Sequence, residues 1–225
     1  MRVLRLAFSV ARKDLAIELR TKESLNAAAA FAVAILLLFS FVFDDPFAVR
    51  DMAGGLLWLV FAFAGALVFN RSFSRELPNE CLDTLLASPL SPASLMLGKA
   101  FSVFFTLLAV ELVSLGVFGI FYNMRWWLRP AELAAVCALA TWGISIVGSV
   151  FGALTVNLRL RELMLPVIIY PLLIPLLIGA IEITNTLITN QPITSYEWLW
   201  GRVLMVFDII FTALALALAE TILVN

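Results

Sequence analysis

Three acidic residues lie within or at the ends of long apolar stretches of the sequence, where a charged group is most able to do chemistry. Glu111 lies well inside one stretch, Asp208 about 8 Å from the outer end of another at 1.5 Å per residue, and Glu182 closes a third. A carboxyl at mid-membrane costs about 2.5–3.5 kcal/mol to insert, so these groups should face a bundle interior, a partner or water. No Lys or Arg in the interiors of the stretches, away from their ends, can pair with them. A polar pathway or subunit contact, and local hydrogen bonding to Ser, Thr or backbone, both stay open.

Residue types that usually carry enzyme chemistry are missing from the sequence. Histidine, the commonest metal ligand and general base, does not occur. Cys81 and Cys137 fall in different kinds of segment and suggest neither a disulfide nor a metal pair. There is no G-x-x-x-x-G-K-[ST] nucleotide loop, no clustered carboxylate pair and no nucleophile motif. We therefore expect a non-catalytic chain that binds no metal or cofactor itself and has no nucleic-acid partner.

The composition indicates that these residues belong to a membrane protein. Of the 225 residues, 63% are hydrophobic and 14% are charged, whereas a soluble domain is about 45–50% apolar and about 25% charged. A membrane-spanning helix needs roughly 20 apolar residues. The sequence predicts an all-α integral membrane fold, a single transmembrane domain over residues 1–225, with six spans at about 27–43, 53–69, 95–121, 131–156, 163–183 and 203–224.

The distribution of Lys and Arg predicts the orientation of the spans. Cytoplasmic loops carry an excess of basic residues. One set of predicted loops holds eleven Lys and Arg and the opposite set holds four. Both termini are therefore expected to be cytoplasmic, with loops 44–52, 122–130 and 184–202 facing outward. Aromatic residues typical of the membrane interface agree with this orientation: Trp126, Trp127, Tyr196, Trp198 and Trp200.

The N-terminal segment, residues 1–26, is predicted to be an interfacial helix. An apolar stripe at helical spacing is flanked by basic residues. Such a helix can lie on the anionic cytoplasmic leaflet. A solvated tail is the alternative. The stripe consists of Leu4, Phe8, Ala11, Leu15 and Leu19.

The cytoplasmic segment between spans 2 and 3 predicts a short amphipathic helix. Asn79 is a suitable N-cap, and Glu80 and Asp83 fall in the first turn, where the helix dipole favours acids. The residue before Pro89 avoids the helical region and ends the helix. Such a helix is a natural docking piece for a soluble partner, and a helix lying flat on the membrane is equally open. Its apolar face is formed by Leu82, Leu85 and Leu86.

Span 5 contains three prolines, Pro166, Pro171 and Pro175. Each removes a backbone donor and clashes with the preceding turn, and the freed carbonyls need partners in lipid. We expect a kinked helix buried in the bundle. The kinks could form a hinge, or they could be static and serve packing alone.

Span 4 carries small residues at helical spacing, which let helices approach closely. They could pack against other helices of the same chain or against another subunit. The stripe and the Gly-x-x-x-Gly pair consist of Thr141, Ser145, Gly148, Ser149 and Gly152.

Beyond these patterns, the sequence resembles a known family. The segment running from Glu76 through Leu-Asp-Thr-Leu-Leu-Ala-Ser-Pro-Leu-Ser to Gly98-Lys99 is similar to the coupling segment of ABC-2-type permeases. Arg-Thr-Lys-Glu-Ser-Leu-Asn at 20–26 and Leu-Pro-Val-Ile-Ile-Tyr-Pro at 165–171 resemble the CcmB family, the permeases of cytochrome c maturation. The resemblance implies a helix that couples to an ATPase, at Glu76, Asn79, Glu80, Leu82, Asp83, Leu85 and Leu86.

The resemblance also implies partners, cargo and location. ATP and Mg would be bound by a separate ABC ATPase, present as two copies. A haem-handling membrane subunit and a small single-helix subunit would lie beside the permease, and a periplasmic haem chaperone would receive haem. A second permease copy is left open. The location would be the bacterial inner membrane, and the 184–202 loop would be a contact surface for periplasmic partners. The alternative is a stand-alone channel or secondary carrier that uses Glu111 and Asp208.

Overall fold

The computed structural model describes residues 2–42, 46–74, 91–124, 126–155 and 161–224. These residues form helices joined by short links, with one 3-10 turn, η2, and no strand among them. The elements are α1 (Arg2–Thr21), α2 (Glu23–Val42), α3 (Pro46–Ser74), α5 (Pro92–Phe121), η2 (Trp126–Leu128), α6 (Pro130–Leu154), α7 (Arg161–Ile188) and α8 (Ser195–Val224).

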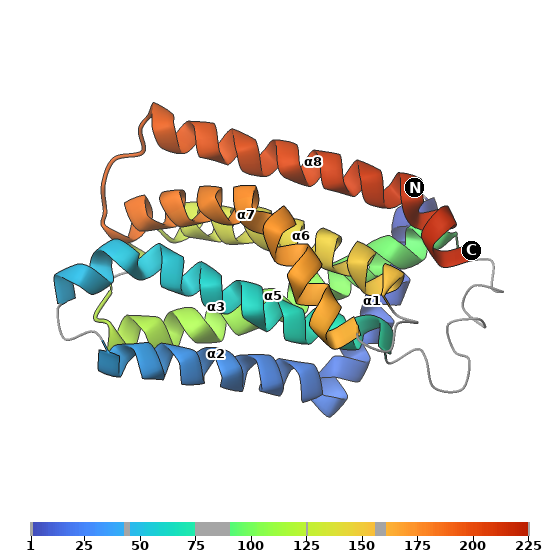
Figure 1. Cartoon of the computed structure of the whole chain (residues 1–225), viewed down its shortest axis with the longest axis horizontal. Helices are drawn as coiled ribbons and strands as arrows, with labels where there is room; N and C mark the ends of the chain where they lie inside the picture. Colours follow the sequence, from blue (N-terminus) through green and yellow to red (C-terminus); the bar gives the residue numbers. More distant parts are fainter. Residues whose placement is uncertain (1, 43–45, 75–90, 125, 156–160, 225) are drawn as a thin grey trace.

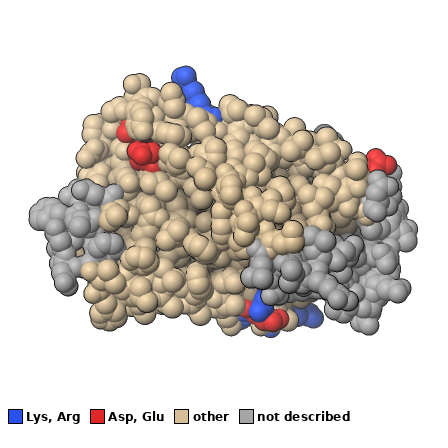
Figure 2. Space-filling view, viewed as in Figure 1, with Lys and Arg blue, Asp and Glu red and all other residues tan. Residues whose placement is uncertain are grey.

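Six of these helices, α2, α3, α5, α6, α7 and α8, are long and apolar enough to cross a membrane. The predicted all-helical fold with six spans is therefore confirmed. Figure 1 shows both termini at one end of the bundle, where α1 crosses the ends of the other helices. We call this the proximal end and the opposite one the distal end. Figure 2 shows a face of the bundle that is largely free of Lys, Arg, Asp and Glu.

The spanning helix α6 lies at the centre of the bundle and packs against α3, α5, α7 and α8. Ser145, Ser149 and Gly152 are buried on it. A Cβ at Gly148 would lie 2.6 Å from the Phe69 ring of α3, so the glycine lets this side chain pack directly on the α6 backbone. The small residues of span 4 thus contact helices of their own chain.

The distal connection between α7 and α8 is shorter than the sequence pattern indicates. Residues 184–202 were expected to form a long outer loop, and this prediction was wrong: α7 continues to Ile188 and α8 begins at Ser195. The polar residues remain helical because they bond to neighbours. Thr184 accepts a hydrogen bond from the Trp58 indole at 2.9 Å, and Asn185 accepts one from the Gly54 N–H at 2.7 Å.

The helix α7 runs through all three of its prolines, and Figure 1 shows it changing direction along its length. The expectation that it lies buried in the bundle was wrong for two of the prolines, because Pro171 and Pro175 are exposed on its outer side. Leu173 and Leu176, both fully buried, provide the packing on its other side. An apolar proline ring suits a lipid-facing position, so the prolines of this helix need not be buried in the bundle.

The N-terminal helix α1 packs against α5 through small residues, Ala7, Val10 and Ala11, which are buried. The predicted apolar stripe lies mostly outside that contact, since Leu4 and Phe8 are 59% and 62% exposed. This leaves the larger apolar side chains free to enter a membrane surface. The helix ends at Thr21, earlier than the predicted residue 26.

Candidate functional site at the proximal end and acids within the bundle

The end of α3 and the start of α5, which flank segment 75–90, both lie at the proximal end, and we call them the stems of this segment. The helix α3 ends at Ser74, and α5 begins at Pro92 after Ser91, whose hydroxyl accepts a hydrogen bond from the Ser94 N–H. The residues predicted for ATPase coupling lie between these stems, outside the described residues: Glu76, Asn79, Glu80, Leu82, Asp83, Leu85 and Leu86.

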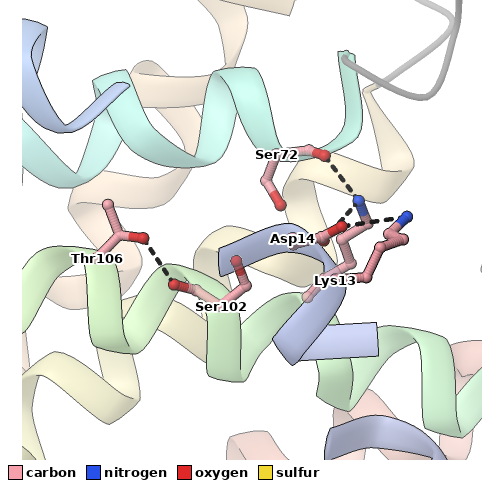
Figure 3. A network of polar contacts seen from close by, with 6 residues as sticks. Lys13, Asp14, Ser72, Ser102 and Thr106 are labelled. Atoms are coloured by element: carbon pink, nitrogen blue, oxygen red, sulfur yellow. Dashed lines mark hydrogen bonds and ion pairs between the residues drawn. The ribbon is translucent and has the colours of Figure 1, made fainter. Parts of the chain in front are cut away.

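A buried lysine on α5 joins three helices at this end. Lys99 is 1% exposed, and its ammonium lies 2.9 Å from Oδ2 of Asp14 on α1. The same ammonium donates to the backbone carbonyl of Ser72 on α3 at 3.0 Å. Lys13 contacts the other oxygen of the Asp14 carboxylate at 3.1 Å. Figure 3 shows Lys13 and Asp14 of α1 lying beside Ser72 of α3. We call Asp14, Lys99 and the Ser72 carbonyl the proximal cluster.

A glycine brings α1 close enough for this ion pair to form. A Cβ at Gly98 would lie 2.6 Å from the Cβ of Val10 and 2.8 Å from the Ala7 carbonyl oxygen. Because Gly98 has no side chain, the two helices approach at backbone distance. The next residue along α5 is Lys99, whose side chain then reaches Asp14, one to two turns farther along α1 than Ala7 and Val10.

The corner between α1 and α2 is held by a buried acid, Glu18. Lys22 adopts a positive φ of 52°, which turns the chain sharply between the two helices. Glu18, 5% exposed, accepts a hydrogen bond from the Leu25 N–H at 2.8 Å. An acid that bonds to a free N–H in the first turn satisfies a donor without an intrahelical partner and suits the helix dipole. The contact therefore fixes the direction in which α2 leaves α1.

A cavity of about 480 Å³ opens beside the proximal cluster. Its wall is largely apolar and also carries charged and hydroxyl side chains, which offer polar partners for water. Lys13, Asp14, Glu18, Ser24, Ser102 and Thr106 are among the residues that line it. In the described part of the chain, no group of three His, Cys, Asp or Glu side chains is arranged to hold a metal ion.

The acids Glu111 and Asp208 lie on opposite sides of α6. Glu111 of α5 is 3% exposed and accepts a hydrogen bond from the Thr141 hydroxyl of α6. Asp208 of α8 is 7% exposed, and its Oδ1 lies close to Gly143, where a Cβ would be 2.8 Å away. Within the described residues, Oε2 of Glu111 and Oδ1 of Asp208 have no hydrogen-bond partner. Each acid therefore keeps an acceptor available inside the bundle.

A mostly apolar groove of about 350 Å³ lies against Glu111 between α5 and α6. Its walls include Leu112 and Leu133, and Trp126 of η2 also lines it. The third predicted acid, Glu182, is half-buried on α7. The three acids thus come from three different helices and do not form a single cluster.

At the distal end, Tyr122 follows α5 and donates a hydrogen bond to the Leu36 carbonyl of α2 at 2.6 Å. Burial raises the pKa of Tyr122 to about 12, so its hydroxyl keeps its proton. This contact closes the distal end of α2 on α5.

The proximal cluster was not anticipated from the sequence. From the sequence, Lys99 counted among the basic residues that set orientation and stood at the end of the segment that resembles an ABC-2 coupling segment, and Asp14 was not singled out. A signal was available, because Lys99 lies inside the predicted 95–121 span, where a lone cation needs a partner. Asp14 and Glu18 are four residues apart on the side of α1 that carries Ala7 and Val10.

Comparison with known proteins places the chain in a family. Residues 5–223 match the family model described as CcmB protein. The chain is 28% identical over 199 residues to heme exporter protein B of Pseudomonas aeruginosa, with 88% of each chain covered. It is 27% identical over 193 residues to heme exporter protein B of Haemophilus influenzae, covering 81% of this chain and 83% of the relative. For heme exporter protein B of Rhodobacter capsulatus the values are 26% over 176 residues, with 77% and 79% covered.

Six apolar helices, with α6 packed between α3, α5, α7 and α8, define a multi-pass membrane protein. The family match covers all six of them and α1 from Arg5 onward. The chain belongs to the CcmB family.

Proposed function

We propose that this chain is the membrane-spanning permease subunit of an ATP-driven ABC transporter complex that supplies haem to a periplasmic haem chaperone during cytochrome c maturation. The observation that carries the proposal is the CcmB match over residues 5–223, together with relatives named heme exporter protein B that align over most of their length. The six spanning helices supply a membrane subunit of the required kind.

ATP hydrolysis is assigned to a separate chain, because this sequence contains no G-x-x-x-x-G-K-[ST] loop. The complex would contain two ABC ATPase copies with ATP and Mg, a haem-handling membrane subunit and a small single-helix subunit. It would lie in the bacterial inner membrane, with the proximal end on the ATPase side. The excess of Lys and Arg in the loops of that end supports this orientation.

The haem-related step is the supply of haem to the chaperone, reached either by haem export or by ATP-driven release of the loaded chaperone. This chain offers no histidine for haem iron, and we assign it a mechanical role in the complex. The stems of segment 75–90 lie at the proximal end and contact α1 and each other through Lys99. Such a joint suits a subunit that receives movement from a soluble partner below the membrane.

Loss of this chain from its native host tests the proposal. Without it, c-type cytochromes should disappear, while b-type cytochromes, which take haem without this route, should persist. The haem-loaded chaperone should also disappear if the complex exports haem, and should persist if the complex releases the loaded chaperone. The wild-type gene should restore the c-type cytochromes. Haem staining of membrane and periplasmic fractions measures the outcome. Normal c-type cytochromes in cells that lack the chain would contradict the proposal.

A stand-alone carrier is the second candidate, favoured by the open carboxyl oxygens of Glu111 and Asp208. Intramembrane acids of this kind mark ion or proton pathways in carriers. The carrier alternative requires transport by the purified chain without nucleotide, whereas the permease proposal requires an ATPase.

A further inference from the structure

The proximal cluster links the two stems of segment 75–90 to each other and to the N-terminal helix. Ser72 lies before the segment on α3, and Lys99 lies after it on α5. One ammonium group bonds the first stem through the Ser72 carbonyl and holds α1 through Asp14, at 3.0 and 2.9 Å. A displacement of either stem therefore acts directly on the same side chain.

Burial makes this link resistant to opening. The Lys99 side chain is 1% exposed, and an amine at such a site depends on its carboxylate partner. If α1 moved away from α5, Lys99 would lose its carboxylate partner Asp14. The close approach at Gly98 also prevents α1 from sliding along α5, because the contact is at backbone distance. The start of α5 and the middle of α1 should thus move as one unit.

The helix α1 can pass such movement onward. Glu18 bonds the Leu25 N–H at the start of α2, so α1 directs the first spanning helix. Leu4 and Phe8 are exposed apolar side chains on its outer side, suited to the membrane surface. Movement received at Lys99 would shift α1 within the leaflet and tilt α2 with it.

We propose that Lys99 is a positioning residue that couples the two stems of segment 75–90 to α1, so that movement imposed by the ATPase reaches α1 and α2 through the Asp14–Lys99 ion pair. This inference rests on the proposed function, because it requires an ATPase that acts on the segment. It assigns to α1 a part in transmission beyond lying on the membrane.

The test compares Lys99→Met with wild type in the complete complex purified from the native host. Three quantities are measured: the ATPase that co-purifies, the rate of ATP hydrolysis, and the haem delivered to the chaperone per ATP hydrolysed. We expect unchanged ATPase binding, a hydrolysis rate within about twofold, and haem per ATP reduced about tenfold, within the range of typical coupling free energies. A purely structural role would lower the ATPase that co-purifies and the total hydrolysis, and would leave haem per ATP unchanged in the complex that still assembles.

Two matched variants separate coupling from loss of charge. Lys13, whose side chain is 41% exposed, is the other lysine that contacts the Asp14 carboxylate. Lys13→Met removes it and should leave haem per ATP at the wild-type value. Lys99→Arg keeps the charge, and the adjoining cavity of about 480 Å³ gives the larger side chain room. It should restore most of the haem delivered per ATP, since a guanidinium can still bind a carboxylate.

A further measurement does not depend on how well a variant accumulates. Hydrogen exchange is followed in the wild-type complex with and without ADP and vanadate. Backbone amides of residues 92–99 and of α1 should change protection together. A change in residues 92–99 with none in α1 would overturn the inference, as would unchanged haem per ATP in Lys99→Met. A wild-type complex that contains no ATPase would instead overturn the proposed function, and the inference with it.

Discussion

The proximal cluster and the acids within the bundle both bury charged groups, but they satisfy them differently. Lys99 bonds a carboxylate and a backbone carbonyl. Glu111 and Asp208 each keep one carboxyl oxygen that has no partner among the described residues. A buried charge that is fully paired fixes geometry, because removing one partner is costly. A buried acid that makes fewer hydrogen bonds constrains the helices around it less.

This difference indicates that the proximal end is held more rigidly than the surroundings of the acids beside α6. The proximal end joins α1, α3 and α5 through one ammonium group, next to a glycine contact at backbone distance. Around α6, Glu111 is contacted by the Thr141 hydroxyl and the Cys137 side chain, and Asp208 is packed closely beside Gly143. Substitutions in the two regions should therefore have effects of different size.

The largest effect is expected from Asp14→Leu. It leaves the Lys99 ammonium buried without its carboxylate and should lower stability by about 3–5 kcal/mol. Lys99→Met should cost clearly less, because Asp14 is 12% exposed and retains Lys13. Thermal unfolding of the purified chain in mild detergent measures both. Equal losses of stability for the two variants, or a wild-type melting temperature for Asp14→Leu, would contradict the dependence of buried Lys99 on the Asp14 carboxylate.

The next effect concerns the close contact between α1 and α5. Gly98→Ala places a Cβ against the Ala7 carbonyl and Val10, and overpacking of this kind costs about 1–3 kcal/mol. Gly116→Ala on the same helix is the matched control, because a Cβ there meets nothing within 4 Å. The control should be neutral or stabilising, since alanine favours a helix over glycine. Tryptic cleavage of α1 should become faster for Gly98→Ala alone, and equal cleavage rates would contradict the contact.

A smaller effect is expected from Thr141→Val. It removes the hydroxyl that donates a hydrogen bond to buried Glu111. The loss of this hydrogen bond should lower stability by about 1–2 kcal/mol. Ser145→Ala serves as the comparison, because the Ser145 hydroxyl bonds the Thr141 carbonyl of its own helix at 2.7 Å. Its loss should be below about 0.5 kcal/mol, as that carbonyl already belongs to the helix. Unfolding temperatures that rank the two variants in the opposite order would argue against the α5–α6 hydrogen bond.

The smallest effect is expected from Glu111→Gln. Glutamine keeps the shape and an oxygen acceptor for Thr141, so stability should change by less than about 1 kcal/mol. Haem supply, followed by haem staining of c-type cytochromes, should stay at the wild-type level. A carrier that moves a proton or ion through Glu111 would lose transport with this change. Loss of c-type cytochromes in stable, normally inserted Glu111→Gln would therefore favour the carrier alternative.

The spans were predictable because each depends on local composition alone. A run of about 20 apolar residues specifies a membrane helix wherever it lies in the chain. The pairing of Asp14 with Lys99 was not predictable in this way, because it joins residues far apart in sequence through the packing of α1 on α5. In the sequence, Lys99 is a basic residue close to a span end. Many lysines at such positions face water, so the position alone does not indicate a buried ion pair.

The error at residues 184–202 has a similar origin. Thr184 and Asn185 are typical of loops, yet here their side chains accept hydrogen bonds from Trp58 and the Gly54 N–H of α3. Polar residues inside a bundle stay helical when a neighbouring helix supplies the donor. The prolines of α7 show the opposite case, because a residue expected to need burial lies on the outer side. Both outcomes depend on which helix is adjacent, and the sequence does not specify this locally.

The proposed function requires an ATPase that acts on this chain at its proximal end. The most direct measurement is purification of the tagged chain from its native membrane in mild detergent, followed by identification of the proteins bound to it. Leu82→Asp with Leu85→Asp places charges on the apolar face predicted to dock, and Thr84→Asp places one on the opposite face. We predict an ATPase with the wild type and with Thr84→Asp, and none with the double variant although it still inserts. A wild-type chain that carries no ATPase, under conditions that preserve other membrane complexes, would contradict the account.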